Sequence, residues 1–243
     1  MPFVQVVGDQ PVYAFIVELK NENPSIFKQI LPVLGSFHIQ LSFMSAIYKR
    51  IQGSNIEDLL SDAGLITSGS VHKALKGKHY YQALRLYELY YEALSRLLIK
   101  YGKDSGIECP ESVHHLINTV KDIENPRDDR HVAFDTIIQS PEFIEYIQLL
   151  RESLNSPDNH LAKYVLSIMD MIEILFMNID SLRRKDWAQF KCSLRLMMPW
   201  MMIYDNTNYG RWLPVFWLDM SSLPAEYDRY MPEIFSQSMS GNS

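Results

Sequence analysis

Two aspartates and one histidine occupy positions at which this chain could carry out chemistry. Asp9 follows the first β-branched run, His38 follows the second apolar run, and Asp205 precedes an apolar segment near the carboxy terminus. Functional groups of α/β proteins gather at the carboxyl ends of strands, and carboxylates in such places hold hard cations well. These three residues are therefore the first candidates for a functional site.

Each of the three residues also has a purely structural explanation. Asp9 stands before a Gln-Pro pair, which is the pattern of a helix N-cap, and Asp205 together with Asn208 fits the same role. His38 at a strand-to-helix junction can be a structural histidine with locally satisfied ring nitrogens. The sequence has no Gly-rich phosphate loop, GxSxG elbow, HExxH helix or EF-hand loop that would decide between the two explanations.

The composition is that of a globular protein with an excess of acidic residues. Its 243 residues are 47% hydrophobic and 21% charged, and the formal net charge is −6. This balance excludes the class of strongly basic DNA-binding proteins, because non-specific nucleic-acid affinity comes mainly from Lys and Arg. Cys109 and Cys192 lack the spacing of a zinc site or of a disulfide framework.

The sequence gives no sign of a secretory or membrane segment. Its first ten residues lack a basic region and reach Asp9 before a long apolar run can form, unlike a signal peptide. The most apolar stretch, residues 165–182, is interrupted by acidic side chains that are costly in hydrocarbon. We therefore expect an intracellular protein, nuclear or cytoplasmic, with no membrane among its partners.

The first fifty residues alternate between strand and helix patterns. Residues 3–7 and 30–34 are short apolar runs with the composition of buried strands. Helices are predicted over residues 12–21 and 38–51, each after one of these runs. This order indicates a parallel pair of strands with a helical crossover. The first two candidate residues then lie just beyond the two strand ends.

Helices are predicted for most of the remaining chain. A short helix over residues 55–62 is followed by an expected loop at residues 67–70, and Ser140-Pro141 begins a later helix. Two long helices are predicted from apolar residues at alternating steps of three and four, which lie on one face of each helix. Two such faces are expected to pack in a helical bundle. These residues are Tyr80, Leu84, Tyr87, Tyr91, Leu94 and Leu98, and then Leu161, Val165, Ile168, Ile172, Leu175, Ile179 and Leu182. Pro199 is predicted to kink or break a late helix.

Three segments carry a resemblance to a known family, and together they cover nearly the whole chain. They read VVGDQPVYAFIVELK, ILPVLGSFHIQLSFM and YDNTNYGRWLPVFWLDM. The chain resembles a domain of unknown function common in transposon-like open reading frames of animals and other eukaryotes. In that family an Asp-Gln-Pro, a Leu-Gly-x-x-His and an Asp-x-x-Asn-Tyr-x-Arg-Trp-x-Pro recur in this order.

A looser similarity extends to cut-and-paste transposases of the Mutator-like and hAT kinds, which have a ribonuclease H-like core. The similarity implies that Asp9 is the second catalytic acid and that Asp205 or Asp219 is the third. It also implies that Gly35 and His38 occupy the positions of a Cys-x-x-His pair, so a glycine replaces the cysteine.

The chemistry implied by the similarity is phosphoryl transfer assisted by two divalent cations, Mg²⁺ or Mn²⁺. Asp9 and Asp205 would be the metal ligands, with Asp219 as the alternative third acid. His38, Asn208 and Arg211 would be further binding residues. In these enzymes the first acid lies on an earlier strand, so the isolated chain is expected to be inactive.

The expected fold class is α+β, predominantly α-helical, with a truncated ribonuclease H-like α/β remnant and a large helical insertion. Residues 1–54 would be the remnant, 55–185 the helical insertion, 186–235 a late helical segment that packs back on the remnant, and 236–243 a disordered tail. The expected function is that of a transposase-derived fragment that meets DNA through a longer or partner chain. The alternative is a non-enzymatic helical protein-interaction module.

We expect the isolated chain to bind duplex DNA weakly, with a shallow dependence of affinity on salt. An acidic protein neutralises few phosphates and so releases few counterions. Fluorescence anisotropy of labelled duplex DNA at stepwise increasing salt measures both quantities. Tight binding that survives raised salt would contradict this expectation.

Overall fold

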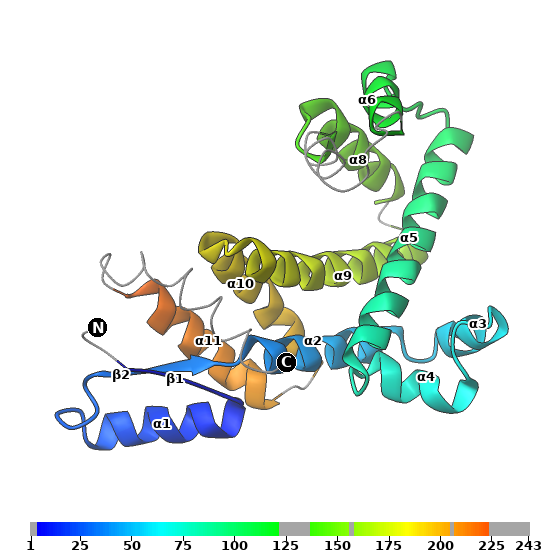
Figure 1. Ribbon diagram of the computed structural model, residues 1–243. Helices are drawn as coiled ribbons and strands as arrows, with labels where there is room; N and C mark the ends of the chain where they lie inside the picture. The colour runs from blue at the N-terminus through cyan, green and yellow to red at the C-terminus, as the bar shows by residue number, and fades with distance from the viewer. Residues whose placement is uncertain (1–3, 122–136, 156–157, 205–206, 224–243) are drawn as a thin grey trace. The chain divides into compact units, whose positions relative to one another are not determined.

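The computed structural model describes residues 4–121, 137–155, 158–204 and 207–223 of the chain. Helices make up most of these residues, and two short strands pair in a small sheet (Figure 1). The predicted predominance of helix with a small parallel sheet is therefore confirmed. The expected carboxy-terminal tail at residues 236–243 lies outside the described residues.

The chain divides into two compact units. The first consists of residues 1–88 and 170–243, and the second consists of residues 89–169. Each unit is described separately below. The predicted division into remnant, insertion and late segment, with boundaries after residues 54 and 185, stays a prediction.

The first unit contains the sheet. β1 (Val4–Gly8) and β2 (Ile30–Leu34) run parallel, with Val6 beside Pro32 in the register. Both strands are rich in branched apolar residues, which suit a pleated and partly buried surface. α1 (Gln10–Glu22) connects them as the crossover. The strand–helix–strand order confirms the sequence prediction for this part of the chain.

Local capping chemistry explains where the first two helices begin. Asp9 is the N-cap of α1, its side chain accepts a hydrogen bond from the Val12 amide, and Pro11 lies in the first turn. α2 (Ser36–Ile51) begins immediately after Gly35. Both helices start two residues earlier than predicted, because their first residues, Gln10 and Ser36, are polar and precede the periodic apolar pattern.

The segment at residues 67–70, which was predicted as a loop, is helical. After α3 (Ile56–Asp62), Thr67 acts as the N-cap of α4 (Ser68–Leu75), so the loop prediction was wrong for residues 68–70. Hydroxyl residues and glycine are common in loops, but they are also the residues preferred at helix caps. Burial of Val71, Ala74 and Leu75 holds this short helix in place.

The last two helices contain prolines. α10 (Trp187–Ile203) runs through Pro199, so the proline does not end the helix, and α11 (Thr207–Ser221) contains Pro214. Met197 and Met201, on either side of Pro199, are fully buried. Their burial offsets the hydrogen bond that a proline removes from a helix. α10 packs on α2 and α11, and α11 also contacts α1 and β2.

A network of polar side chains lies inside the first unit. The Gln40 side-chain amide donates to Asn178 Oδ1 at 2.9 Å, and Asn178 Nδ2 donates to Ser193 Oγ at 2.9 Å. The Tyr80 hydroxyl donates to Gln40 Oε1 at 2.6 Å. Gln40, Asn178 and Ser193 are buried. Buried polar groups are costly unless they are hydrogen-bonded. The network therefore fixes the positions of Gln40 on α2 and Ser193 on α10 relative to Asn178 and Tyr80.

The second unit consists of parts of two long helices and of two shorter helices. α5 (Tyr80–Asp104) and α9 (His160–Arg184) each have residues in both units, and α6 (Glu111–Lys121) and α8 (Pro141–Leu154) lie within the second. The two predicted apolar stripes fall on α5 and α9, as expected. Figure 1 shows both as long unbroken helices.

The second unit is packed closely where α5 meets α8. Leu150 is fully buried, and its side chain leaves no room for a Cβ at Gly102. Ser140 caps α8 by accepting a hydrogen bond from the Phe143 amide at 3.3 Å, as the Ser-Pro pattern predicted. Val113 of α6 is also fully buried, which agrees with the contact between α6 and α8.

Within the described part of the chain, no helix is both long enough and apolar enough to cross a membrane. This holds for residues 165–182 of α9, the most apolar stretch of the sequence. Asp170, Glu173 and Asp180 interrupt that stretch.

The polar network leads to a stability prediction. Replacing Asn178 with Ala leaves Gln40 and Ser193 without their buried partner, and each such group costs about 1–3 kcal/mol. We expect the free energy of unfolding of Asn178→Ala to fall by roughly that amount or more in urea denaturation. The control Gln82→Ala, at an exposed position on α5, should change it by less than about 0.5 kcal/mol. Equal effects of the two substitutions would contradict the network's role.

Candidate functional site

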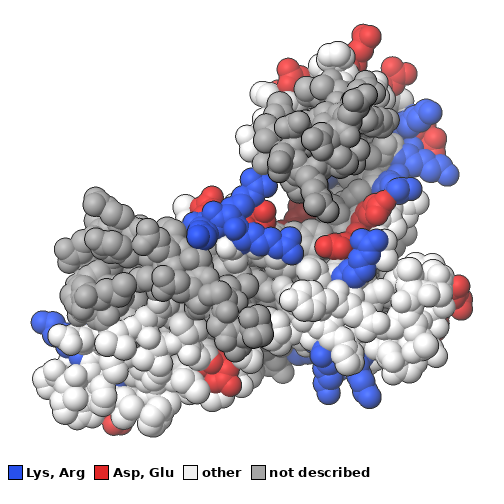
Figure 2. Space-filling model, in the orientation of Figure 1, with Lys and Arg blue, Asp and Glu red and all other residues white. Residues whose placement is uncertain are grey.

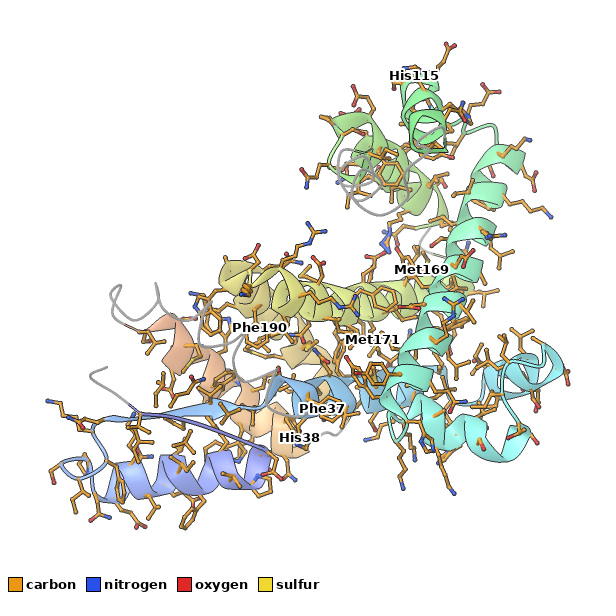
Figure 3. All side chains as sticks on the ribbon, viewed as in Figure 1. Phe37, His38, His115, Met169, Met171 and Phe190 are labelled. Carbon is orange, nitrogen blue, oxygen red and sulfur yellow. The ribbon has the colours of Figure 1, made fainter. Side chains whose placement is uncertain are left out.

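The carboxyl ends of β1 and β2 meet at one edge of the sheet. The Gly35 amide donates to the Gly8 carbonyl oxygen at 2.7 Å, which extends the ladder one residue beyond β2. Asp9 follows Gly8 and the first turn of α2 follows Gly35, so both leave the sheet from adjacent residues. Figure 3 shows Phe37 and His38 in that first turn, beside the beginning of α1. We call the edge formed by Gly8, Asp9, Gly35 and His38 the strand-end site.

Two glycines allow the close approach at this site. A Cβ on Gly35 would lie 3.1 Å from the Gly8 carbonyl oxygen and 3.6 Å from Cδ2 of His38. A Cβ on Gly8 would lie 2.5 Å from Cγ1 of Val12. A side chain at Gly35 would crowd the Gly8 carbonyl oxygen, and one at Gly8 would clash with the side chain of Val12. The structure thus accounts for a glycine at the position where the resemblance places a cysteine.

Asp9 has a definite structural role at this site. Its carboxylate accepts a hydrogen bond from the Val12 amide at 3.3 Å, and its carbonyl oxygen accepts one from the Tyr13 amide at 2.9 Å. The backbone is extended, with φ −68° and ψ 178°, as an N-cap requires. A carboxylate can accept several hydrogen bonds or ligands, so the cap does not exhaust its capacity.

The beginning of α11 lies against the strand-end site. Burial, followed by the negative charge of Asp9, raises the pKa of Tyr209 to about 12, while a hydrogen bond with the Gln10 backbone acts in the opposite direction. Sequence reasoning missed Tyr209 as a site residue. Its position in the Asn-Tyr-x-Arg-Trp pattern quoted above was the available signal.

The predicted binding residues Asn208 and Arg211 flank this tyrosine on α11, and both are exposed. The Arg211 guanidinium lies 5.0 Å from the ring centroid of Trp212, in cation–π geometry. Trp212 in turn makes an edge-on contact with Tyr13, with ring centroids 5.9 Å apart. The structure thus anchors this end of α11 on α1 through aromatic contacts.

Asp219 lies apart from the strand-end site. It accepts a long hydrogen bond of 3.5 Å from the Tyr13 hydroxyl. Partial burial raises the pKa of the Asp219 carboxyl above its ordinary value. The positive charge of Lys20 and the hydrogen bond from Tyr13 lower this pKa, but by less. Ten residues of helix separate Asp219 from Tyr209, which is about 15 Å at 1.5 Å per residue.

The structure therefore brings some of the predicted site residues together and leaves others apart. Asp9 and the first turn of α2, which carries His38, follow adjacent strand ends, and the helical turn that carries Asn208 and Arg211 begins beside Asp9. Asp205 lies outside the described residues. Within the described ranges, no three His, Cys, Asp or Glu side chains are grouped so that they could hold a metal ion.

Charge around the sheet is sparse on the face shown in Figure 2. The part of the surface that corresponds to α1 and the strands in Figure 1 is mostly uncharged, with few Lys or Arg side chains. A groove that tracks nucleic acid usually presents many cations. The described surface around α1 and the strands therefore presents few of the cations that such a groove uses.

Comparison with known families and structures gives one match. A family model described as "Domain of unknown function (DUF8702)" matches residues 1–240. The chain belongs to this family. No curated protein and no solved structure matches it. Membership in DUF8702 assigns no activity, so the transposon-like resemblance of the sequence stays a hypothesis.

A pair of glycine substitutions tests the packing at the strand-end site. Gly8→Ala places a methyl group against Val12, and we expect it to lower the free energy of unfolding by about 1–3 kcal/mol. Gly69→Ala, in the first turn of α4 with open space around its Cβ, should be neutral or slightly stabilising. Thermal and urea unfolding of both variants measure the difference. A Gly8→Ala variant as stable as Gly69→Ala would contradict the close packing.

Proposed function

We propose that this chain derives from a transposase and that the strand-end site is what remains of a metal-dependent site for DNA phosphoryl transfer. One observation supports the proposal above all others. Asp9 and His38 lie at the adjacent carboxyl ends of two parallel strands, where α/β proteins place their functional groups. The late helix α11 returns to the same place.

The donor atoms at this site suit a weakly held Mg²⁺ or Mn²⁺. Mg²⁺ keeps several of its waters and is commonly bound through one or two carboxylates. The Asp9 carboxylate offers one such ligand beside its cap hydrogen bond. His38 is exposed, so its imidazole can reach a water or a phosphate oxygen near the same edge. The described residues thus support a single, mostly hydrated cation.

Catalysis by two metals needs more than these residues provide. Two cations roughly 4 Å apart require several carboxylates around them, and Asp219 stands far along α11 from Asp9. We therefore propose that the isolated chain binds a divalent cation without cleaving DNA. Contact with DNA would come through a longer or partner chain, because the net charge of −6 opposes direct binding.

The second candidate is a non-enzymatic helical interaction module. Two observations favour it, since the Asp9 carboxylate caps α1 and the Asp219 carboxylate is bonded to Tyr13. Both aspartates thus have structural roles that need no metal. This candidate predicts that removing the charge of Asp9 changes no cation binding at all.

A substitution at Asp9 separates the two candidates. Asn is as good an N-cap as Asp, so Asp9→Asn removes the charge and keeps the cap. We expect Mn²⁺ binding, followed by isothermal titration and by the electron paramagnetic resonance of free Mn²⁺, to weaken at least about tenfold in this variant. The matched control is Asp58→Asn, an exposed aspartate in the first turn of α3.

Circular dichroism and thermal melting should show that both variants fold like the unmodified chain. Equal Mn²⁺ affinity in the two variants, or no Mn²⁺ binding by the unmodified chain, would reject the metal-site proposal and favour the interaction module.

A further inference from the structure

The outer edge of β1 has no strand partner among the described residues. In the parallel ladder the Val4 amide donates to the Gln29 carbonyl oxygen at 2.6 Å, and the Gly8 carbonyl oxygen accepts from Gly35. Residues of a strand direct their backbone groups alternately to the two sides. Residues 4, 6 and 8 therefore face β2, and Gln5 and Val7 direct their amides and carbonyls away from it. Among the described residues, β1 pairs with β2 alone.

The opposite edge of the sheet is closed. On β2 the residues that face away from β1 are Ile30, Pro32 and Leu34, by the same alternation. Pro32 has no amide hydrogen, and prolines are a common means of blocking a strand edge. Pro32 and Leu34 are also buried, and α11 packs on this strand. In the part of the chain that the structure describes, β1 is therefore the edge at which the sheet can be extended.

The open edge carries none of the usual protection against pairing. β1 reads Val-Gln-Val-Val-Gly, without a charge or a proline. Natural edge strands are usually guarded by charged residues, prolines or bulges. Val4 is 60% exposed and Val7 is 43% exposed, so both branched side chains stand partly in water. An unguarded apolar edge of this kind is the surface that strand addition uses.

We propose that β1 pairs antiparallel with β1 of a second copy of this chain, about a two-fold axis at Val6. Residues 5 and 7 are symmetric about Val6, so the outward backbone groups of Gln5 face those of Val7 in the second copy. Each of these two pairs exchanges both N–H···O bonds, which gives four hydrogen bonds across the axis. The resulting sheet has four strands, in the order β2–β1–β1–β2.

The self-pairing is favoured by symmetry and by charge. A two-fold arrangement uses the same edge on both copies and closes, whereas a head-to-tail array would need the outer edge of β2, which Pro32 blocks. In the antiparallel pair the two Asp9 residues lie at opposite ends of the strands, six residues or about 20 Å apart. No like charges are brought together. A sheet of two strands is marginal alone, and a four-stranded sheet is not.

Disulfide trapping tests the register of the pair. Val6 occupies a non-hydrogen-bonded position on the axis, where facing Cα atoms are about 4.5 Å apart, within the range of a disulfide. In a Cys109→Ser, Cys192→Ser background, Val6→Cys should give a disulfide-linked dimer under mild oxidation. The matched control is Val4→Cys, whose two copies would lie about 13 Å apart and should stay reduced. Equal cross-linking of the two variants would overturn the proposed register.

Proline substitution tests the interface itself. Val7→Pro removes an outward amide, which a free edge tolerates but a paired edge does not. Val7→Thr keeps both the amide and a branched side chain. Sedimentation velocity of the full chain over a dilution series should show a dimer for the unmodified chain and for Val7→Thr, and a monomer for Val7→Pro.

Circular dichroism will show whether Val7→Pro is folded, and if it is not, the cysteine pair decides. A monomer at every concentration of the unmodified chain, or a dimer that persists in folded Val7→Pro, would overturn the proposal. The proposal does not depend on metal binding at Asp9.

Discussion

The hydrogen bond between Gly35 and Gly8 is the contact on which the sheet end depends. It brings a Cβ at Gly35 to within 3.1 Å of the Gly8 carbonyl oxygen, and the side chain of Val12 leaves no room for a Cβ at Gly8. From this contact α1 and α2 leave in fixed directions, and Tyr13 of α1 then receives Trp212 and Phe216 of α11. The aromatic contacts of Tyr13 thus help to position α11, which also packs on α10.

Much of the first unit could be predicted because its signals are local. Branched apolar runs specify β1 and β2, and Asp9 before Pro11 specifies the start of α1. The loop predicted at residues 67–70 was wrong for residues 68–70, and of the kink or break predicted at Pro199 the helix shows no break. Hydroxyl residues favour loops as well as caps, and a proline such as Pro199 is tolerated in a helix when buried neighbours hold it.

The candidate site was predictable only in part, because its assembly is tertiary. Asp9 and the helix that carries His38 begin at adjacent strand ends, which periodicity and topology suffice to suggest. No local sequence pattern predicts that Tyr209 lies near Asp9. Nor does any local pattern predict that Asp219 accepts a hydrogen bond from Tyr13. The neighbours of each residue on α11 depend on the orientation of that helix, which is set by its packing on α10, α1 and β2.

The buried network of Gln40, Asn178, Tyr80 and Ser193 has a consequence for how this sequence can diverge. Its members come from four helices. Each side chain hydrogen-bonds a polar group of another member that would otherwise be buried without that partner. A lineage that replaced one of them by an apolar residue would gain fitness only by replacing its partners as well. These four positions should therefore change in concert across relatives, while the aliphatic residues around them drift one at a time.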